Sequence, residues 1–331
     1  MYTVALIGAG SIAEWHLKAI PKIKELKSIA IADAAYEKAK KHSAIYGLTA
    51  YHDYKNMIKF EKPDIVVICL PHYLHKEVAV WCAQQGCHLL LEKPMALNVQ
   101  ECDEIIKTAA SHKVKLMVGH IQQYQAVNQK AKEIIQSSEL GQLVMINDSR
   151  HLNYFAKERP SWFFEREKAG GGILMNIGVH SVNKIQWLTE SMITGVKAAI
   201  TCFGDRGNIE GSGLIFLEID GGITATISQS GYKGAAKDET EFIFTNGMMK
   251  LVGGKEIHVS RGGPYREVLL EKTEDPFFLQ FNDLLKCIQK DQEPGCSGRD
   301  GRNVVAVMEA IYQSCETQRE VIMIKEGYCA T

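Results

Sequence analysis

Short apolar runs alternate with longer amphipathic stretches over the first 120 residues of this 331-residue chain. The runs are typical of buried strands, and the stretches between them have helical spacing. This alternation predicts an α/β fold with a doubly wound parallel sheet, in which ligands bind at the carboxyl ends of the strands. The predicted strands are 4–7, 29–32, 65–70, 88–91 and 116–118, and the clearest predicted helices are 34–46, 75–85 and 99–112.

The pattern changes after about Gly119. Successive β runs separated by turn signals occupy residues 193–271, and helical segments at 277–289 and 302–318 close the chain. This half predicts an α+β domain with a large open, mostly antiparallel sheet. We therefore expect two domains, a dinucleotide-binding domain over 1–120 and a substrate-binding and oligomerisation domain over 121–331.

Composition and charge exclude several function classes. Hydrophobic residues make up 46% of the chain, charged residues 23%, and the formal net charge is −1, so no global field recruits nucleic acid or a membrane surface. No apolar run approaches the roughly 18 residues of a membrane span, and no signal peptide is recognised. The nine cysteines include no Cys-x-x-Cys pair. This predicts reduced thiols in a cytoplasmic protein without a metal site.

A glycine-rich turn follows the first predicted strand, and Asp33 closes the second. Gly8 permits the tight turn, and Gly10 lets the backbone approach a pyrophosphate. The helix that begins at Ser11 and Ile12 points its N–H groups at the phosphates. A carboxylate at Asp33 would accept hydrogen bonds from both ribose hydroxyls and repel a 2′-phosphate. The segment therefore predicts NAD binding rather than NADP binding.

Lys93 follows the predicted strand 88–91, where a nicotinamide ring would lie. A lysine there can hold a substrate hydroxyl by a charge-assisted hydrogen bond and favour its alkoxide form. The alternative is a lysine that merely caps a strand exit. The following X-Pro bond can be cis. His72 and His75 lie between a predicted loop and a helix start, and a loop facing the cofactor is favoured over a metal site.

A second constellation begins at the glycines of 170–172. Asn176, His180 and Asn183 follow at i, i+4 and i+7, which is one stripe of a helix. His180 is a candidate general base because its unperturbed pKa lies near operating pH. The alternative is a histidine satisfied within the core. Trp162 is a candidate sugar-stacking side chain or a packing residue.

Taken together, the Gly-Ala-Gly-Ser-Ile-Ala turn, the Glu-Lys-Pro tripeptide and the Gly-Gly-Gly…Asn…His helix resemble the glucose–fructose oxidoreductase / inositol dehydrogenase (Gfo/Idh/MocA) family. The resemblance implies that Lys93 is the catalytic lysine and His180 the acid/base histidine. It also implies that Glu92 faces the nicotinamide ribose and that Pro71 lines the nicotinamide pocket. The second domain would join copies into a homodimer or homotetramer through its sheet.

Four positions depart from the family pattern and leave the substrate open. Asn176 and Asn183 stand where many members carry Asp, Gln123 where Arg is common, and His72 where Asn is common. An amide at position 176 can bind a sugar hydroxyl, but it cannot raise the pKa of a histidine by charge.

These observations predict an NAD-dependent dehydrogenase that transfers a hydride between nicotinamide and a secondary alcohol of a sugar, polyol or glycoside. The alternatives are a redox-assisted glycosidase with tightly bound NAD and an NAD-binding regulatory protein. The predicted substrate-binding side chains are mostly neutral, which favours an uncharged substrate with several hydroxyls; Arg159 and Arg166 are the nearby exceptions. These side chains are Lys93, Gln122, Trp162, Asn176 and His180.

Overall fold

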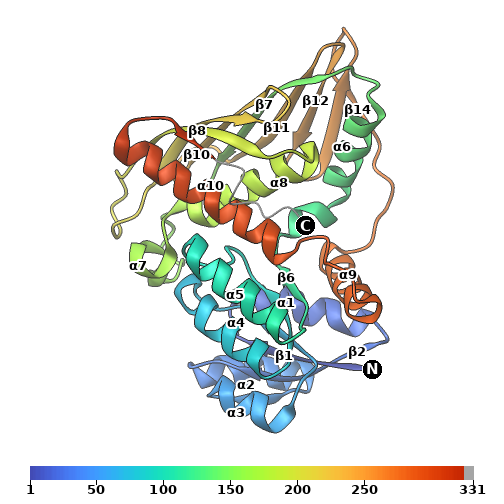
Figure 1. Cartoon of the computed structure of the whole chain (residues 1–331), viewed down its shortest axis with the longest axis vertical. Coiled ribbons are helices and arrows are strands. Elements are labelled where there is room, and N and C mark those ends of the chain that lie inside the picture. Colours follow the sequence, from blue (N-terminus) through green and yellow to red (C-terminus); the bar gives the residue numbers. More distant parts are fainter. Residues whose placement is uncertain (324–331) are drawn as a thin grey trace. The chain divides into compact units, whose positions relative to one another are not determined.

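The computed structural model describes residues 1–323, and these fall into two compact units (Figure 1). Unit 1 comprises Met1–Ile121 and Glu274–Arg302, and unit 2 comprises Gln122–Thr273 with the described residues from Asn303 onward. The predicted second domain extended to residue 331, and its residues 324–331 lie outside the described part.

The predicted two-domain division was wrong for residues 274–302. This segment carries helix α9 (Pro276–Lys290) and packs with unit 1 rather than with the second half of the chain. The physical reason is the apolar face of α9, where Phe281 and Leu284 are fully buried in one core with Leu17 and Ile20. Helical periodicity identifies such a face but not the core that it covers.

Within the described residues of unit 1, six parallel strands form a sheet in the order β3-β2-β1-β4-β5-β6. This confirms the predicted doubly wound sheet. The strand order reverses between β1 and β4, so the carboxyl ends of these strands flank the expected ligand crevice. The strands are β1 (Tyr2–Ile7), β2 (Leu26–Ala32), β3 (Thr49–Tyr51), β4 (Ile65–Ile68), β5 (His88–Leu91) and β6 (Leu116–Val118). The other helices of this unit are α1 (Ser11–Ala19), α2 (Tyr36–Tyr46), α3 (Tyr54–Glu61), α4 (His75–Gln84) and α5 (Val99–Ser111).

Nine strands form the sheet of unit 2 within its described residues, in the order β14-β13-β12-β11-β7-β10-β9-β8-β15. β7 and β10 are parallel and the other neighbouring strands pair antiparallel, as the sequence predicted. The strands are β7 (Leu143–His151), β8 (Ile193–Thr201), β9 (Ser212–Ile219), β10 (Ile223–Ser230), β11 (Lys237–Phe244), β12 (Gly247–Val252), β13 (Glu256–Ser260), β14 (Arg266–Glu267) and β15 (Val321–Ile322).

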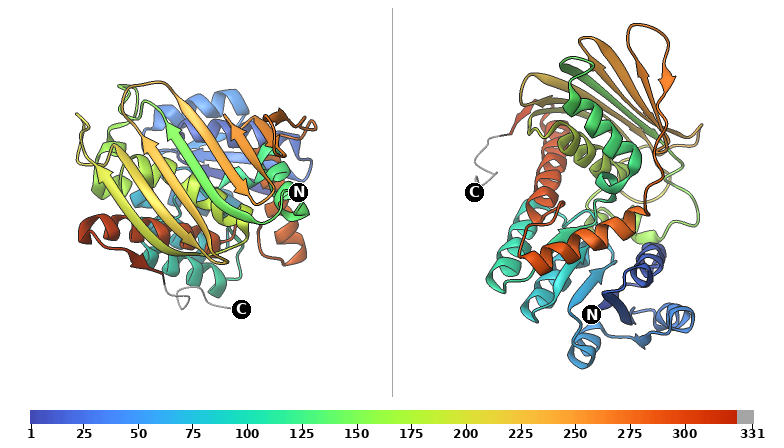
Figure 2. Two further views of the ribbon diagram at one scale, coloured as in Figure 1. Left: turned by 90° about the horizontal axis from the view of Figure 1, so that it is seen from above. Right: turned by 90° about the vertical axis from the view of Figure 1, so that its right-hand side faces the viewer.

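The two faces of this sheet differ. Buried side chains of the strands share a core with α6 (Ala126–Ser137), α8 (Val179–Thr189) and the part of α10 (Gly298–Thr317) that belongs to unit 2. The opposite face is left uncovered in the left-hand view of Figure 2. Strand β9 shows the alternation, because Ile215 and Leu217 are buried whereas Leu214 and Phe216 are 61% and 41% exposed.

Among residues 1–323, the helices are too short or too polar for any of them to cross a bilayer.

Candidate functional site

The glycine-rich turn after β1 has the geometry of a dinucleotide cradle. Gly8 has φ +98°, and a Cβ there would lie 2.3 Å from the carbonyl oxygen of Cys69, so the position requires glycine. A Cβ at Gly10 would meet no protein atom within 4 Å. Helix α1 begins directly after Gly10, and no side chain caps its first turn. The turn thus leaves open space and helix N–H groups for a pyrophosphate.

Asp33 lies at the end of β2 and is held by backbone groups. Its Oδ2 accepts a hydrogen bond from Ala9 N at 2.8 Å, and its Oδ1 accepts one from Ala35 N at 2.7 Å. Each carboxylate oxygen has a further lone pair with which to accept a ribose hydroxyl. The carboxylate therefore links the glycine-rich turn to β2 and is oriented before a ligand binds.

Glu92 follows β5 and is buried. Its Oε1 lies 2.9 Å from Nε2 of His16, a buried residue of α1 that the sequence analysis did not single out. Burial would raise the pKa of Glu92, but the His16 hydrogen bond and the charges of His16 and Lys93 outweigh it and hold that pKa below its ordinary value. Glu92 is therefore ionised at neutral pH and joins the strand end to the helix that begins at the phosphate cradle.

Lys93 is half-buried, and its bond to Pro94 is cis. The fully buried His120 lies within electrostatic range of Lys93. Burial above all, together with the Lys93 charge, lowers the pKa of His120 to about 3. His120 is accordingly neutral and adds no positive charge beside Lys93.

The segment 71–75 packs against the same loop. Pro71 precedes a 3₁₀ turn over His72–Leu74, and His72 is buried. The ring of His75 lies between two backbone carbonyls, 2.8 Å from Pro94 O through Nδ1 and 2.9 Å from Leu70 O through Nε2. Burial lowers the pKa of His75, so the neutral ring donates to one of these carbonyls in a given tautomer. Both ring nitrogens face protein backbone, which gives His75 a positioning role. A direct contact of Pro71, His72 or His75 with the cofactor stays a prediction.

In unit 2, the close approach that the glycines at 170–172 permit is to protein groups. A Cβ at Gly172 would lie 2.1 Å from the carbonyl oxygen of Glu210, and one at Gly171 would lie 1.9 Å from the Tyr312 hydroxyl. The Glu210 carboxylate accepts hydrogen bonds from Gly172 N at 2.7 Å and Leu174 N at 3.0 Å, and Tyr312 donates to it at 3.0 Å. A buried carboxylate thus caps the segment that carries the candidate histidine.

The polar stripe expected on this helix is modified by a π-helical turn over Leu174–Gly178, in which Val179 N donates to Leu174 O. The predicted i, i+4 relation of Asn176 and His180 assumed regular α-helix, so it does not describe this segment. Asn176 is buried beside the fully buried Tyr154 phenol, and His180 is half-buried at the start of α8. Asn183 is buried, and within residues 1–323 its Oδ1 has no hydrogen-bond partner.

The remaining predicted residues of unit 2 lie on other segments. Trp162 is half-buried in a 3₁₀ turn over Ser161–Phe164 and stacks on Phe163 with ring centroids 3.7 Å apart. Gln122 is buried, and its backbone and side-chain oxygens both accept from Asn128 Nδ2, at 2.8 and 3.2 Å. The predicted cofactor-binding residues and Lys93 thus gather in unit 1, whereas Gln122, Trp162, Asn176 and His180 belong to unit 2.

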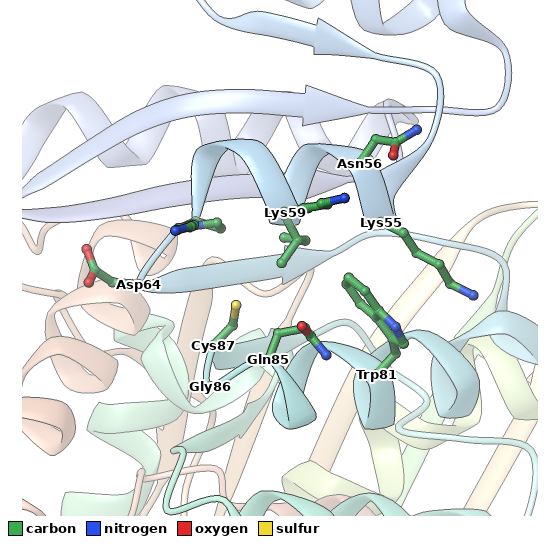
Figure 3. A pocket seen from close by; sticks show the side chains of 11 residues that line it. Lys55, Asn56, Lys59, Asp64, Trp81, Gln85, Gly86 and Cys87 are labelled. Atoms are coloured by element: carbon green, nitrogen blue, oxygen red, sulfur yellow. The ribbon is translucent and has the colours of Figure 1, made fainter.

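A pocket of about 570 Å³ in unit 1 contains none of the predicted site residues. Figure 3 shows Lys55 and Lys59 of α3 facing Trp81 of α4 across it. Cys87 at its base has a pKa raised to about 11, by burial first, which makes it a poor nucleophile.

Comparisons with known proteins assign both units. Residues 2–120 match the family model of an oxidoreductase family with an NAD-binding Rossmann fold, and residues 128–250 match the GFO/IDH/MocA C-terminal domain. The chain is 21% identical to myo-inositol 2-dehydrogenase of Thermotoga maritima over 96% of this chain and 97% of that protein.

Two further comparisons differ in how much of each protein they cover. The chain is 31% identical to 2,7-anhydro-N-acetylneuraminate hydratase of Mediterraneibacter gnavus over 51% of this chain, but the match spans only 43% of that protein. The crystal structure of aldose-aldose oxidoreductase from Caulobacter crescentus complexed with glycerol has a TM-score of 0.90 and 25% identity, covering 97% of this chain and 99% of that chain. Unit 1 is thus an NAD-binding domain, and NAD is the cofactor.

Proposed function

Because the chain belongs to the Gfo/Idh/MocA oxidoreductase family, we propose that it oxidises a secondary alcohol of a sugar, polyol or glycoside. The observation that carries the proposal is the pair of candidate groups that the two units present. Lys93 follows strand β5 beside an ionised Glu92, and His180 lies in the first turn of α8 in unit 2, after the segment whose Gly172 and Leu174 N–H groups donate to Glu210.

Each group has a distinct role in the proposed reaction. Lys93 donates a charge-assisted hydrogen bond to the substrate oxygen and favours its alkoxide form. His180 accepts the hydroxyl proton as general base. Bound NAD would supply the acceptor for the hydride of the alcohol carbon. Asn176 holds a neighbouring hydroxyl through its amide, while Trp162 and Gln122 complete the proposed substrate set.

The names of relatives support this substrate class, since they include an inositol dehydrogenase and an aldose-aldose oxidoreductase. In the same proposal Gly8, Gly10, Ser11 and Ile12 hold the pyrophosphate and Asp33 holds the adenosine ribose. Pro71, His72, His75 and Glu92 shape the nicotinamide end.

We also propose that copies of the chain associate through the uncovered face of the unit 2 sheet. On that face Leu214 and Phe216 of β9 are 61% and 41% exposed, and Met145 of β7 is 36% exposed. Exposed apolar side chains on an uncovered sheet face support an interface there. Light scattering of the purified protein should give a dimer or tetramer, and Leu214→Glu with Phe216→Glu should shift it towards monomer.

The test of activity is the absorbance at 340 nm when purified protein is mixed with NAD and a panel of sugars, polyols and glycosides. Net NADH formation supports the dehydrogenase. Release of an aglycone without net NADH favours the redox-assisted glycosidase instead. Tight NAD binding with neither outcome would favour a regulatory protein.

A further inference from the structure

The guanidinium of Arg159 lies over two aromatic rings of unit 2. The guanidinium carbon lies 4.1 Å from the ring centroid of Tyr154 and 5.1 Å from that of Phe163. Nε donates a hydrogen bond to the Tyr154 carbonyl oxygen at 2.8 Å. Two cation–π contacts and one backbone hydrogen bond therefore hold the side chain in place.

Among the described residues, this cation lacks a protein counter-charge. Within residues 1–323, Arg159 forms no ion pair with an aspartate or glutamate, and the Nε bond is the one hydrogen bond that its side chain donates. Arg166, seven residues later, is paired instead with Glu316 at 3.4 Å. A partly desolvated charge without a partner is costly, and proteins rarely keep one without a use.

The donors that remain on Arg159 have a definite shape. Because Nε is engaged by Tyr154, the N–H groups of Nη1 and Nη2 form the end of the planar fork. That end matches the two oxygens of a carboxylate in bidentate geometry. A phosphate ester carries nearly two charges and is usually met by more than one cation.

Tyr154 connects this fork to the candidate substrate residues. Its fully buried ring contacts Arg159 on one face, and its hydroxyl lies beside the Asn176 side chain. One aromatic ring thus separates Arg159 from an amide proposed to hold a substrate hydroxyl. Arg159 and Asn176 thus contact the same tyrosine.

We propose that Arg159 binds a carboxylate of the substrate, so that the site takes a polyhydroxylated acid such as a uronate or aldonate. The inference rests on the proposed function, because it assumes that Asn176 and His180 face the substrate. It replaces the sequence-based expectation of an uncharged substrate, in which Arg159 was an exception without an assigned role.

The experiment compares matched pairs of compounds by NADH formation. The pairs are D-glucuronate with D-glucose, D-galacturonate with D-galactose, and D-gluconate with D-glucitol. Glucose 6-phosphate is added as a phosphate probe. We expect the acid of a pair to have the higher kcat/KM. Arg159→Gln should lower kcat/KM for the acid by about 10- to 100-fold and leave the neutral partner unchanged. Arg159→Lys should restore part of the loss, and the paired arginine variant Arg166→Gln should behave as wild type.

Several outcomes overturn the proposal while leaving the dehydrogenase intact: faster turnover of the neutral partners, a preference for the phosphate ester, or an equal loss for both members in Arg159→Gln. If no compound reduces NAD, titration calorimetry of the NAD-loaded protein with the same acids decides. Acid binding that is lost in Arg159→Gln but kept in Arg166→Gln supports the carboxylate site. In that case the missing NADH formation counts against the proposed reaction alone. Acids that bind no better than their neutral partners refute it.

Discussion

Lys184 and Asp148 form an ion pair inside unit 2, with Nζ and Oδ2 2.7 Å apart and their side chains 3% and 0% exposed. Lys184 belongs to α8 and Asp148 to β7. Ser181 of α8 donates to the other Asp148 oxygen at 2.6 Å, and Thr240 of β11 also donates to Asp148. The pair therefore fixes the helix that carries His180 against the sheet.

Removing one partner of this pair should be severe. Lys184→Met leaves Asp148 buried without its counter-charge, and we expect a loss of about 3–5 kcal/mol in the free energy of unfolding. The double variant Lys184→Met with Asp148→Leu should recover much of that loss, because no charge remains buried. Urea denaturation of the two variants measures both values. If Lys184→Met were as stable as wild type, the ion pair with Asp148 would not hold α8 against the sheet.

Glu210 should give unit 2 a characteristic pH dependence. Burial raises the pKa of this carboxyl above its ordinary value, although four hydrogen bonds oppose the shift. The folded state then binds the proton more tightly than the unfolded state. The contribution to stability is thus greatest below the ordinary pKa and is lost as the pH rises through the raised one.

Urea midpoints measured from about pH 4 to pH 7 should therefore fall less with pH in Glu210→Gln than in wild type. Glu92→Gln is the control of opposite sign, followed below the ordinary pKa of 4.5, because the pKa of Glu92 is lowered and its contribution is lost on acidification. Parallel profiles for wild type and Glu210→Gln would count against a raised pKa at Glu210.

Cofactor preference should depend on Asp33. We expect wild-type kcat/KM to favour NAD over NADP by about 100-fold, since a carboxylate facing a 2′-phosphate costs several kcal/mol. Asp33→Ser with Ala34→Arg should narrow the preference. Asp33→Asn separates charge from geometry, because an amide oxygen can still accept from Ala9 N or Ala35 N. Equal wild-type rates with the two cofactors would exclude this role.

The proposed catalytic groups should be separable by cofactor binding. Lys93→Ala and His180→Ala should each lower kcat by about 10²- to 10⁴-fold, through loss of alkoxide stabilisation at Lys93 and of a positioned proton acceptor at His180. His180 belongs to unit 2, so NAD affinity measured by fluorescence titration should change much less in His180→Ala. Near-normal turnover in His180→Ala would identify the histidine as a packing residue.

Asn176 should affect binding more than chemistry. If its amide only holds a hydroxyl, Asn176→Ala should raise KM more than it lowers kcat. Asn176→Asp tests the departure from the family pattern, because a carboxylate at this position can raise the pKa of His180 and move the kcat profile to higher pH. A large fall in kcat with unchanged KM in Asn176→Ala would instead place the amide at the reacting atoms.

The parts of the fold that the sequence predicted depend on local signals. The apolar runs locate the parallel strands, and the Gly8 turn with Asp33 identifies the cradle because each residue acts within one strand–helix corner. The sequence pattern could not predict the partners of the glycines at 170–172, because Glu210 and Tyr312 are distant in sequence. The π-helical turn likewise has no signal in a pattern read at 3.6 residues per turn.

His16 and Tyr154 were missed for a related reason. His16 lies among the apolar positions of α1, where its spacing matches the buried face, and only the contact with Glu92 distinguishes it. Tyr154 follows β7 in a segment without helical or strand period. Its link to Asn176 appears only once the chain has folded.

Because residues 274–302 belong to unit 1, that unit is completed only after most of unit 2 has been synthesised. The ribosome makes every strand from β7 to β14 before it makes Phe281, Leu284 and Leu285, which help fill the core around Leu17. Until α9 is made, the core of the nascent unit 1 around Leu17 stays exposed while the strands of unit 2 are synthesised. Exchanging this domain between relatives therefore means moving two separate stretches of the gene, and a fragment that stops near residue 120 should aggregate.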